Sequence, residues 1–447
     1  MLTKSRILCL GLFSIAFALS TSTVFAQNLD LADRPLLSGV NVPPNILVAV
    51  DDSGSMDFET LFPTDSGLLY WDGNRSSTWT GSGFVQSSNN AYAYLFPNGY
   101  NGTDRDRRIY SNYYAAPPIP AFAFARSPAY NSAYFDPSVP TYDPWLGKPN
   151  SSPTNAPADP VTGSHRLNLT QVLERTDDGY TFAVFNNTPF GNVRYADVVC
   201  VRFGLFSCRE YGYEWKTSSS TATFNNNQLV PISYFPATFY LPSNTPLPAS
   251  FGWKSGSPTR VGHAPNGDKT LTGYEIKPGN FVSTAAYNKA IQNFANWYTY
   301  YRKRHLATRA GVVAAFDEIS GVHVGACTIN QANQNSSANL VMRNLGIENS
   351  SQPDGRADFY SQIFNTDFSQ ARGTPNRPAL KYLGEQLRNN SNIIQSACQR
   401  NFAILFTDGY NTDSVNGIGN ADQGSRARRT FGEPFGDNYS NTIADVA

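Results

Sequence analysis

The chain has 447 residues, of which 40% are hydrophobic and 13% aromatic, as in a folded protein. Lys and Arg together number 34, and Asp and Glu also number 34, so the basic excess typical of nucleic-acid-binding proteins is absent. Because one compact core rarely organises so long a chain, we expect two domains or one domain with a large insertion.

The first residues have the pattern of an export signal. Lys4 and Arg6 precede a mostly apolar run from 7 to 20, and Val24-Phe25-Ala26 supplies small residues at the positions needed for cleavage. We therefore predict a signal peptide over 1–26 and cleavage after Ala26. A retained membrane anchor is the weaker alternative, because the apolar run is short for a span. No later stretch is apolar enough to cross a bilayer, so we expect an exported protein with no transmembrane segment in its mature chain.

Three short apolar runs predict the strands of a sheet. They are "NILVAV" (45–50), "VHVGAC" (322–327) and "FAILFT" (402–407). Uninterrupted apolar runs of this length suit strands that are covered on both faces, as in a parallel sheet. Periodicity alone leaves short buried helices open as the alternative.

Three helices are predicted to accompany these strands. The apolar stripe of the first consists of Tyr287, Ile291, Phe294, Tyr298 and Tyr301. Three consecutive cations, 302–304, follow near its end, where positive charge suits the helix dipole. A second helix is predicted over 308–319. A third begins near Pro378 and stops near Asn389-Asn390; its inward residues are Leu380, Leu383 and Leu387. Strands that alternate with helices predict an α/β fold with a parallel sheet.

Residues 58–280 have a different composition. This stretch is rich in Tyr, Phe, Asn, Ser and Pro, and it contains no long helical stripe. We interpret it as an irregular, β-rich insertion after the first strand, held together by aromatic packing. Disorder is the minor alternative, because so many aromatic side chains can bury substantial area.

Removal of the signal peptide leaves four cysteines, Cys200, Cys208, Cys327 and Cys398. An even number in an exported chain favours disulfides. The stretch "VVCVRFGLFSCRE" reads as two short strands that turn near Gly204, so we favour a Cys200–Cys208 disulfide, which leaves Cys327 to pair with Cys398. Free buried thiols are the alternative, and the spacing does not match the usual C-x-x-C zinc ligands.

The first predicted strand ends in a cluster of oxygen-bearing side chains, "LVAVDDSGSMDFE" (47–59). Asp51, Ser53 and Ser55 stand at alternate positions, so their oxygens can face one direction. Magnesium prefers six oxygen ligands in near-octahedral array, some of them water, and three protein ligands on one loop are too few. Further candidates are Thr374 in "RGTPNRPAL" and Asp408 in "LFTDGY", because ligands gather beyond the carboxyl ends of parallel strands.

Other interpretations of these residues are less favoured. Singly, each Ser and Asp is as well explained by capping of helices and turns. Three neighbouring carboxylates, Asp52, Asp57 and Asp413, are expected to be solvated or to support the ligands. Enzyme signatures are missing from the sequence: no G-x-S-x-G elbow, no H-E-x-x-H and no G-x-x-x-x-G-K loop occurs.

Three segments together carry a resemblance. D-x-S-x-S after an apolar strand, G-T-P before a helix and T-D-G after a later strand resemble the three loops of the von Willebrand factor A domain. The resemblance implies a Rossmann-like parallel sheet flanked by helices, formed here by 27–57 and 281–447. It also implies a metal-ion-dependent adhesion site with Asp51, Ser53, Ser55, Thr374 and Asp408 as ligands. Mg²⁺ is the expected ion, with Ca²⁺ or Mn²⁺ as alternatives.

A wider resemblance covers most of the mature chain. "GVNVPPNILVAVDDSGSMDFE", "YNSAYFDPSVPTYDPW", "NFANWYTYYRKRHLATRAGV", "RGTPNRPAL" and "CQRNFAILFTDGYN" resemble the amino-terminal region of PilY-type proteins. These proteins are tip-associated adhesins and assembly factors of bacterial type IV pili. The large carboxyl-terminal β-propeller of the family is not in this sequence, so the A domain is expected to be truncated at its carboxyl end.

The resemblance implies a binding protein rather than an enzyme. We expect it in the periplasm, at the outer-membrane surface, at a pilus tip or outside the cell. Its expected partners are minor pilins and a host or surface ligand that offers an acidic side chain to the metal. The alternative is a structural factor that primes pilus assembly, with a metal that only stabilises the fold. A metal-dependent hydrolase is a third, less favoured hypothesis.

Overall fold

The computed structural model describes residues 42–64, 66–70, 91–97, 110, 113–149, 153–159, 167–176, 180–224, 228–265, 270–334, 337–347, 351–409, 412–421 and 439–447. The predicted signal peptide lies outside these residues. None of the helices in the described part is long and apolar enough to cross a membrane.

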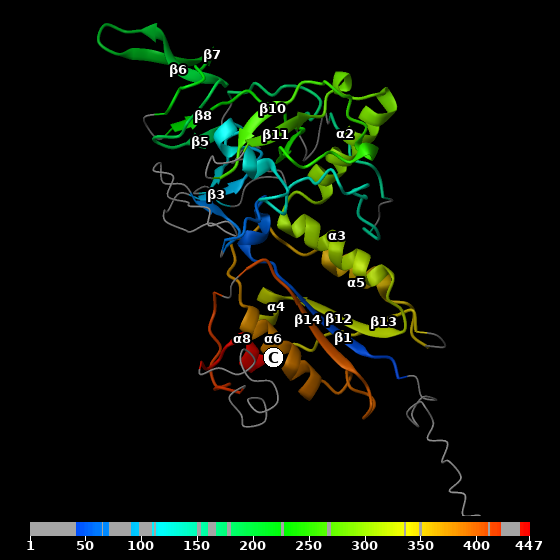
Figure 1. The fold of residues 1–447 in the computed structure, drawn as a ribbon. Coiled ribbons are helices and arrows are strands. Elements are labelled where there is room, and N and C mark those ends of the chain that lie inside the picture. Colours follow the sequence, from blue (N-terminus) through cyan, green and yellow to red (C-terminus); the bar gives the residue numbers. More distant parts are fainter. Residues whose placement is uncertain are drawn as a thin grey trace, which may run out of the picture.

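A four-stranded sheet forms the lower part of the molecule in Figure 1. Its strand order is β13 (Arg343–Leu345), β12 (Val322–Thr328), β1 (Asn45–Val50) and β14 (Asn401–Phe406). β1 is parallel to β12 and to β14, whereas β13 is antiparallel to β12. The three predicted strands are therefore confirmed as parallel neighbours, although they are far apart in the chain.

Helices cover both faces of this sheet, which makes it the middle of three layers (Figure 1). One face carries α3 (Arg304–Asp317) and α5 (Arg356–Phe364), and the other carries α4 (Ile329–Gln334) and α6 (Asn376–Asn389). Side chains of β1 alternate between the layers, so Val48 packs toward α3 and α5 while Leu47 packs toward α6. This double burial explains the uninterrupted apolar run. β14 differs, because it lies at the sheet edge among the described residues and exposes Phe402.

The insertion is a second body built from short strands around aromatic side chains. Its strands are β2 (Leu69–Tyr70), β3 (Ala91–Tyr94), β4 (Tyr114–Ala115), β5 (Phe182–Val184), β6 (Arg194–Phe203), β7 (Cys208–Thr217), β8 (Gln228–Val230), β9 (Thr238–Pro242), β10 (Arg260–His263) and β11 (Thr270–Glu275). Short 3-10 helices interrupt the chain at Gly54–Asp57 (η1), Pro120–Arg126 (η2), Ala249–Phe251 (η3) and Pro278–Asn280 (η4). The core is a continuous aromatic cluster, in which Phe135 contacts Phe239, Phe294 and Trp297.

Helix α2 (Thr284–Tyr300) belongs to this aromatic core. The Ser283 side chain caps its first turn by accepting a hydrogen bond from the Ala286 amide. Its buried stripe includes the predicted Ile291, Phe294 and Tyr298, which pack into the insertion rather than onto the sheet. The last helix of the chain, α8 (Ile443–Val446), is held by a capping box between Thr442 and Asp445.

Three buried ion pairs join the two bodies. The consecutive cations 302–304 follow the end of α2, as the sequence predicted, and Arg302 Nη1 donates to the Tyr298 carbonyl in its last turn. They also turn inward at the junction between α2 and α3. Arg302 Nε lies 3.0 Å from Glu59 Oε1, and Lys303 Nζ lies 2.7 Å from Asp57 Oδ1. These partners follow β1, so the pairs fix the start of the insertion against its end.

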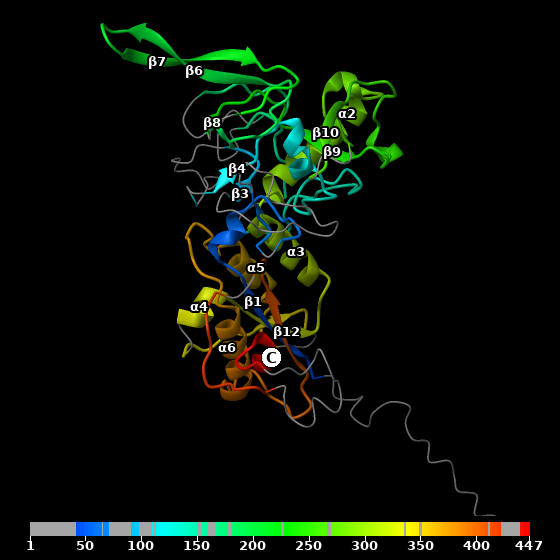
Figure 2. The same cartoon turned by 60° about the vertical axis from the view of Figure 1, so that its left-hand side comes forward.

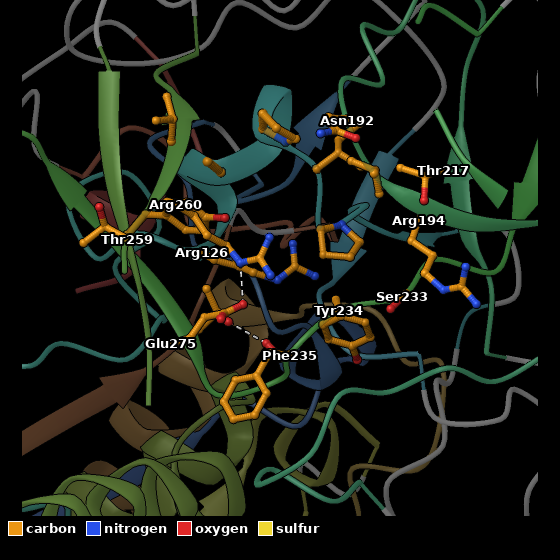
Figure 3. A pocket seen from close by; sticks show the side chains of 18 residues that line it. Arg126, Asn192, Arg194, Thr217, Ser233, Tyr234, Phe235, Thr259, Arg260 and Glu275 are labelled. Atoms are coloured by element: carbon orange, nitrogen blue, oxygen red, sulfur yellow. Dashed lines mark hydrogen bonds and ion pairs between the residues drawn. The ribbon is translucent and has the colours of Figure 1, made fainter. Parts of the chain in front are cut away.

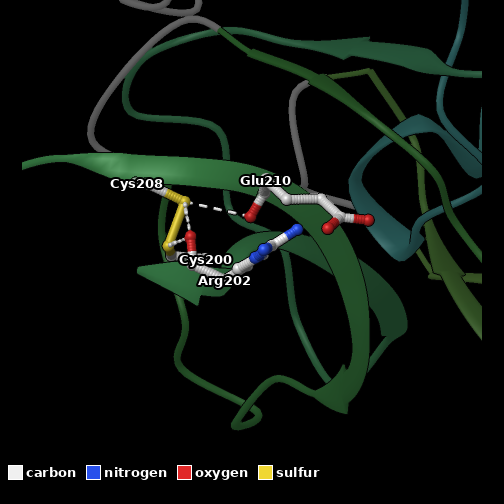
Figure 4. Close-up of a disulfide and its surroundings, with 4 residues drawn as sticks. All are labelled: Cys200, Arg202, Cys208 and Glu210. Atoms are coloured by element: carbon white, nitrogen blue, oxygen red, sulfur yellow. Dashed lines mark hydrogen bonds between the residues drawn. A yellow bond between two sulfur atoms is a disulfide. The ribbon is translucent and has the colours of Figure 1, made fainter. Parts of the chain in front are cut away.

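The Cys200–Cys208 disulfide is formed, as predicted, and it links the two strands of the β6–β7 hairpin (Figure 4). The second predicted pair is wrong, because Cys327 and Cys398 are both free thiols. Cys327 is level with Ala49 and hence with Leu405, near the carboxyl end of the sheet. Cys398 precedes Asn401 at the opposite end, and four residues of strand already separate the two levels by about 13 Å. A disulfide needs Cα atoms within about 7 Å.

The insertion also contains a cavity of about 490 Å³ between η2, the base of the β6–β7 hairpin and the sheet of β9, β10 and β11 (Figure 3). Arg126, Arg194 and Arg260 line it, together with Glu275, which pairs with Arg260. None of the five predicted metal ligands is among the residues that line this cavity.

Replacing Arg302 by Met is expected to lower the free energy of unfolding by about 3–5 kcal/mol, because Glu59 would stay buried without its counter-charge. Urea denaturation of the signal-free protein measures this change. A control, Lys381→Met, removes one partner of the exposed Lys381–Glu385 pair and should cost less than about 1 kcal/mol. The double variant Glu59→Gln with Arg302→Met should recover part of the loss, and equal effects of the two single Met variants would contradict the assignment.

The four cysteines should differ in reactivity. Burial, with a smaller contribution from Asp52, raises the pKa of Cys327 to about 12, so this thiol carries little thiolate at pH 8. Iodoacetamide should therefore label exposed Cys398 in the native protein and Cys327 only after unfolding, with Cys200 and Cys208 protected until reduction. Peptide mass spectrometry checks this pattern, and a cross-linked Cys327–Cys398 peptide would refute it.

Candidate metal centre

The predicted oxygen ligands lie at the carboxyl edge of the sheet, where it meets the insertion. Because β1 and β14 are parallel and in register from Asn45–Asn401 to Val50–Phe406, the residues that follow them emerge side by side. The Asp51 amide donates to the Phe406 carbonyl and continues this ladder by one step. Asp51 and Asp408 are thereby brought together although 357 positions of sequence numbering separate them on the chain.

Asp51 is completely buried and held by two donors. Its Oδ1 accepts a hydrogen bond from the Ser53 amide at 2.7 Å, which closes a tight turn after the strand. Its Oδ2 accepts from the Thr407 hydroxyl at 2.7 Å. Thr407 is a residue that the sequence analysis did not single out, and its position directly before Asp408 was the signal that it shares the site.

Ser53, Ser55 and Asp408 form a chain of oxygens across the two loops. The hydroxyls of Ser53 and Ser55 lie 3.0 Å apart, and the Ser55 hydroxyl donates to Asp408 Oδ1 at 2.9 Å. Four of the five predicted ligands thus meet in one small region through direct contacts or through the Asp51–Ser53 turn. Ser55 is partly exposed, so this is the side on which the group can be reached.

Thr374 lies on a neighbouring loop, and backbone contacts hold that loop beside the group. The Gly54 amide donates to the Arg372 carbonyl at 3.0 Å, and Asn330 Nδ2 donates to the Gly373 carbonyl at 3.1 Å. Thr374 itself is buried, and its amide donates a hydrogen bond to the Thr412 hydroxyl oxygen at 2.7 Å. The structure therefore places this loop at the site. Among the described residues, the Thr374 hydroxyl makes no hydrogen bond to the other four predicted ligands.

Arg304 is the main participant that sequence reasoning missed. Its Nη1 lies 2.7 Å from Asp408 Oδ2, while Oδ1 of the same carboxylate faces Ser55. The guanidinium also donates to the carbonyls of Thr60 and Ser66 at the start of the insertion. Arg304 thus orients Asp408 and ties the site to the insertion. No local pattern in "RKRH" distinguishes this role from that of a solvated cation.

Two of the neighbouring carboxylates, Asp52 and Asp57, are buried, which favours the supporting role over the solvated one of the two that the sequence left open. Asp52 accepts from Asn330 and pairs with Arg372 at 2.8 Å, which links the first loop to the loop of Thr374. Asp57 pairs with Lys303 and accepts from the Tyr94 hydroxyl at 2.7 Å. Both need these partners because an unpaired buried carboxylate is costly.

The insertion closes one side of the group. Tyr110 packs on Gly54 so closely that a Cβ at this glycine would meet the Tyr110 hydroxyl oxygen at 2.0 Å. Burial first, and then Tyr113, Asp57 and Asp408, raise the pKa of Tyr110, so its hydroxyl stays protonated beside the carboxylates. Gly54 is therefore required by close approach of the insertion as well as by the turn.

The electrostatics and donor types fit a hard divalent cation. Burial first, and then the nearby charge of Asp408, raise the pKa of Asp51 to about 6, although hydrogen bonds from Ser53 and Thr407 oppose the rise. Asn376 adds a buried Oδ1 that has no hydrogen-bond partner among the described residues, while its Nδ2 contacts Thr407. Two carboxylates, several hydroxyls and a free acceptor oxygen are the ligand types that Mg²⁺ and Ca²⁺ prefer.

Softer metals are not suggested by the geometry. Across the described residues, no three or more His, Cys, Asp or Glu side chains are grouped so that they could hold a metal. The hydroxyl-rich group at the sheet edge is a different type of site, since only two of its members are carboxylates.

Comparison with known proteins adds a family. The sequence is 24% identical to the "Type IV pilus biogenesis factor PilY1" of Pseudomonas aeruginosa strain PAO1 over an alignment of 458 positions. This alignment covers 97% of this chain and 30% of the relative. The corresponding protein of strain PAK is 30% identical over 182 residues, covering 35% of this chain and 15% of the relative. That of strain UCBPP-PA14 is 27% identical over 171 residues, covering 35% and 14%.

The chain is a homologue of the PilY1 type IV pilus biogenesis factors. This confirms the resemblance to PilY-type proteins along nearly the whole sequence. The chain spans less than a third of the length of the curated PilY1 relatives that it matches. No family model matches the sequence, and no solved structure matches it.

Proposed function

We propose that this protein acts in type IV pilus biogenesis and binds a partner through a divalent cation at the carboxyl edge of its sheet. The observation that carries the proposal is the oxygen chain from Ser53 through Ser55 to Asp408, supported by Asp51 and bordered by the loop of Thr374. The PilY1 relatives, which are named type IV pilus biogenesis factors, support the first part.

We further propose that 27–57 and 281–447 form a domain of the von Willebrand factor A type and that 58–280 is an insertion in it. Parallel β12, β1 and β14 with helices on both faces support this Rossmann-like assignment, as does the position of the oxygen group beyond the strand ends. The aromatic core that includes α2 shows how closely the insertion is joined to the domain.

The proposed chemistry follows from the charges of the residues. A bound Mg²⁺, or alternatively Ca²⁺ or Mn²⁺, would supply a Lewis-acidic centre with room for one more oxygen ligand. Asp51 and Asp408 offset its charge, and the hydroxyls of Ser53, Ser55 and Thr374 complete the protein ligands without adding negative charge. Arg304 and Thr407 hold the two carboxylates in place. An acidic side chain of a partner is then the favoured remaining ligand, approaching from the partly exposed Ser55 side.

Two kinds of partner follow from this proposal. Pilus subunits, including minor pilins, are the partners in biogenesis, and a host or surface ligand with an acidic side chain is the partner in adhesion.

The second candidate function is assembly alone, with a cation that stabilises the fold. It is favoured by the burial of Asp51 and Ser53 and by the cover that Tyr110 provides.

Asp51→Asn and Ser55→Ala should each weaken Mg²⁺ or Mn²⁺ binding by at least about tenfold, because each removes an oxygen donor from the group. Isothermal titration calorimetry of the signal-free protein measures this. Asp143→Asn, at an exposed carboxylate outside the site, is the matched control and should bind the cation normally. Without metal, Asp51→Asn should be at least as stable as the parent, since it removes a buried like charge beside Asp408. If the parent takes up no Mg²⁺, Mn²⁺ or Ca²⁺, the metal proposal is refuted.

The two functions separate in cells. Asp51→Ala in a piliated strain that depends on this protein should reduce surface adhesion while the number of pili stays unchanged, because the variant loses the cation but keeps the fold. Electron microscopy counts the pili and a washing assay measures adhesion, with Asp143→Ala as the control. Loss of pili with normal adhesion per remaining pilus would instead assign the site to assembly.

A further inference from the structure

The β6–β7 hairpin projects from the insertion at the end of the molecule opposite the sheet (Figures 1 and 2). Its two strands pair over ten residues each, and their tip is the turn 204–207. Three large apolar side chains stand at this tip: Phe203 is 79% exposed, Leu205 87% and Phe206 98%. Single exposed apolar residues are ordinary on proteins, but three adjacent ones at almost full exposure mark an interaction surface.

The tip is rigid before it meets any partner. The Cys200–Cys208 disulfide joins the strands directly behind the turn (Figure 4). The Gly204 amide donates to the Ser207 carbonyl at 2.7 Å and closes the turn itself. Because the loop is already ordered, little conformational entropy is lost when its apolar side chains are buried against another surface.

Behind the tip of the hairpin, the exposed side chains are first charged and then aromatic. Arg202 and Arg209 flank the apolar turn together with one carboxylate, Glu210, which lies opposite Arg202; all three are exposed, so this level of the hairpin keeps a net positive charge. Tyr211 and Tyr213 follow on β7 and are 68% and 44% exposed. In a bilayer with anionic headgroups, apolar side chains lie deepest, and guanidinium groups and tyrosines lie nearer the headgroups. The side chains of the hairpin follow the same order. The tip is also convex and narrow, which suits insertion between lipids better than the broad contact of a protein interface.

We propose that the tip of the β6–β7 hairpin inserts into a lipid surface that carries anionic headgroups. Phe203, Leu205 and Phe206 enter the apolar layer, and Arg202 and Arg209 contact the headgroup phosphates. The proposal does not depend on the cation site, which lies at the carboxyl edge of the sheet, at the junction with the insertion and away from the hairpin tip (Figures 1 and 2).

Vesicle flotation of the signal-free protein tests this insertion. The protein should float with vesicles of phosphatidylcholine and phosphatidylglycerol (3:1) at least tenfold more than with phosphatidylcholine alone, and EDTA should not change this. The triple variant Phe203→Ser, Leu205→Ser and Phe206→Ser should lose at least tenfold of the binding. Its matched control, Val172→Ser, Val261→Ser and Val341→Ser, replaces exposed apolar residues elsewhere and should bind normally.

The arginines have their own test. Arg202→Gln with Arg209→Gln should lose the preference for the anionic vesicles, whereas Arg388→Gln with Arg400→Gln, also exposed, should retain it. Thermal unfolding should be the same for all variants, because every replaced side chain is exposed. Failure of the parent to float with either vesicle, or equal flotation of the tip variant and its control, overturns the proposal. The proposal is also overturned if the parent does not bind vesicles and the tip variant loses adhesion to a lipid-free protein surface. This pair of results would assign the tip to a protein partner.

Discussion

Three consecutive cations paired with three buried carboxylates hold this molecule together. Arg302 pairs with Glu59, Lys303 with Asp57 and Arg304 with Asp408. The three cations lie at the junction between α2 and α3. Because the chain bends there, neighbouring side chains point to different partners. Two of the carboxylates follow β1 and the third follows β14, so the pairs join the beginning of the insertion, its end and the carboxyl edge of the sheet. Because an isolated buried charge is expensive, these three regions are stable only when assembled together.

The candidate metal centre depends on this constraint. The register of β1 with β14 brings Asp51 beside Asp408, and Arg304 then selects which Asp408 oxygen turns toward Ser55. The same guanidinium donates hydrogen bonds to the Thr60 and Ser66 carbonyls, so it connects the insertion directly to the oxygen group. This gives the insertion a physical connection to the site, in addition to the cover provided by Tyr110. The geometry of the oxygen group at the sheet edge therefore depends on the position of the insertion.

Two regions of the molecule differ chemically. At the carboxyl edge of the sheet, where it meets the insertion, the oxygen-bearing side chains of the candidate metal centre lie together. At the far end of the insertion, a disulfide-closed hairpin exposes apolar and basic side chains. Between them lies a core of edge-to-face aromatic contacts that needs no long strands, since large rings bury enough area to stabilise short segments.

The sequence by itself determined the parts of the molecule that local pattern specifies. Uninterrupted apolar runs marked β1 and β12, which are largely buried on both faces, and β14, whose edge position exposes Phe402; a helical stripe marked α2. Alternate oxygens after β1 and the motifs around Thr374 and Asp408 marked the candidate ligands, and the close spacing of Cys200 and Cys208 predicted their disulfide. Only the tertiary structure decided which distant groups meet. It paired the cations 302–304 with buried carboxylates, separated Cys327 from Cys398 to opposite ends of the sheet, and packed α2 into the insertion. Strand register and burial arise from contacts between segments hundreds of residues apart, and no local pattern contains them.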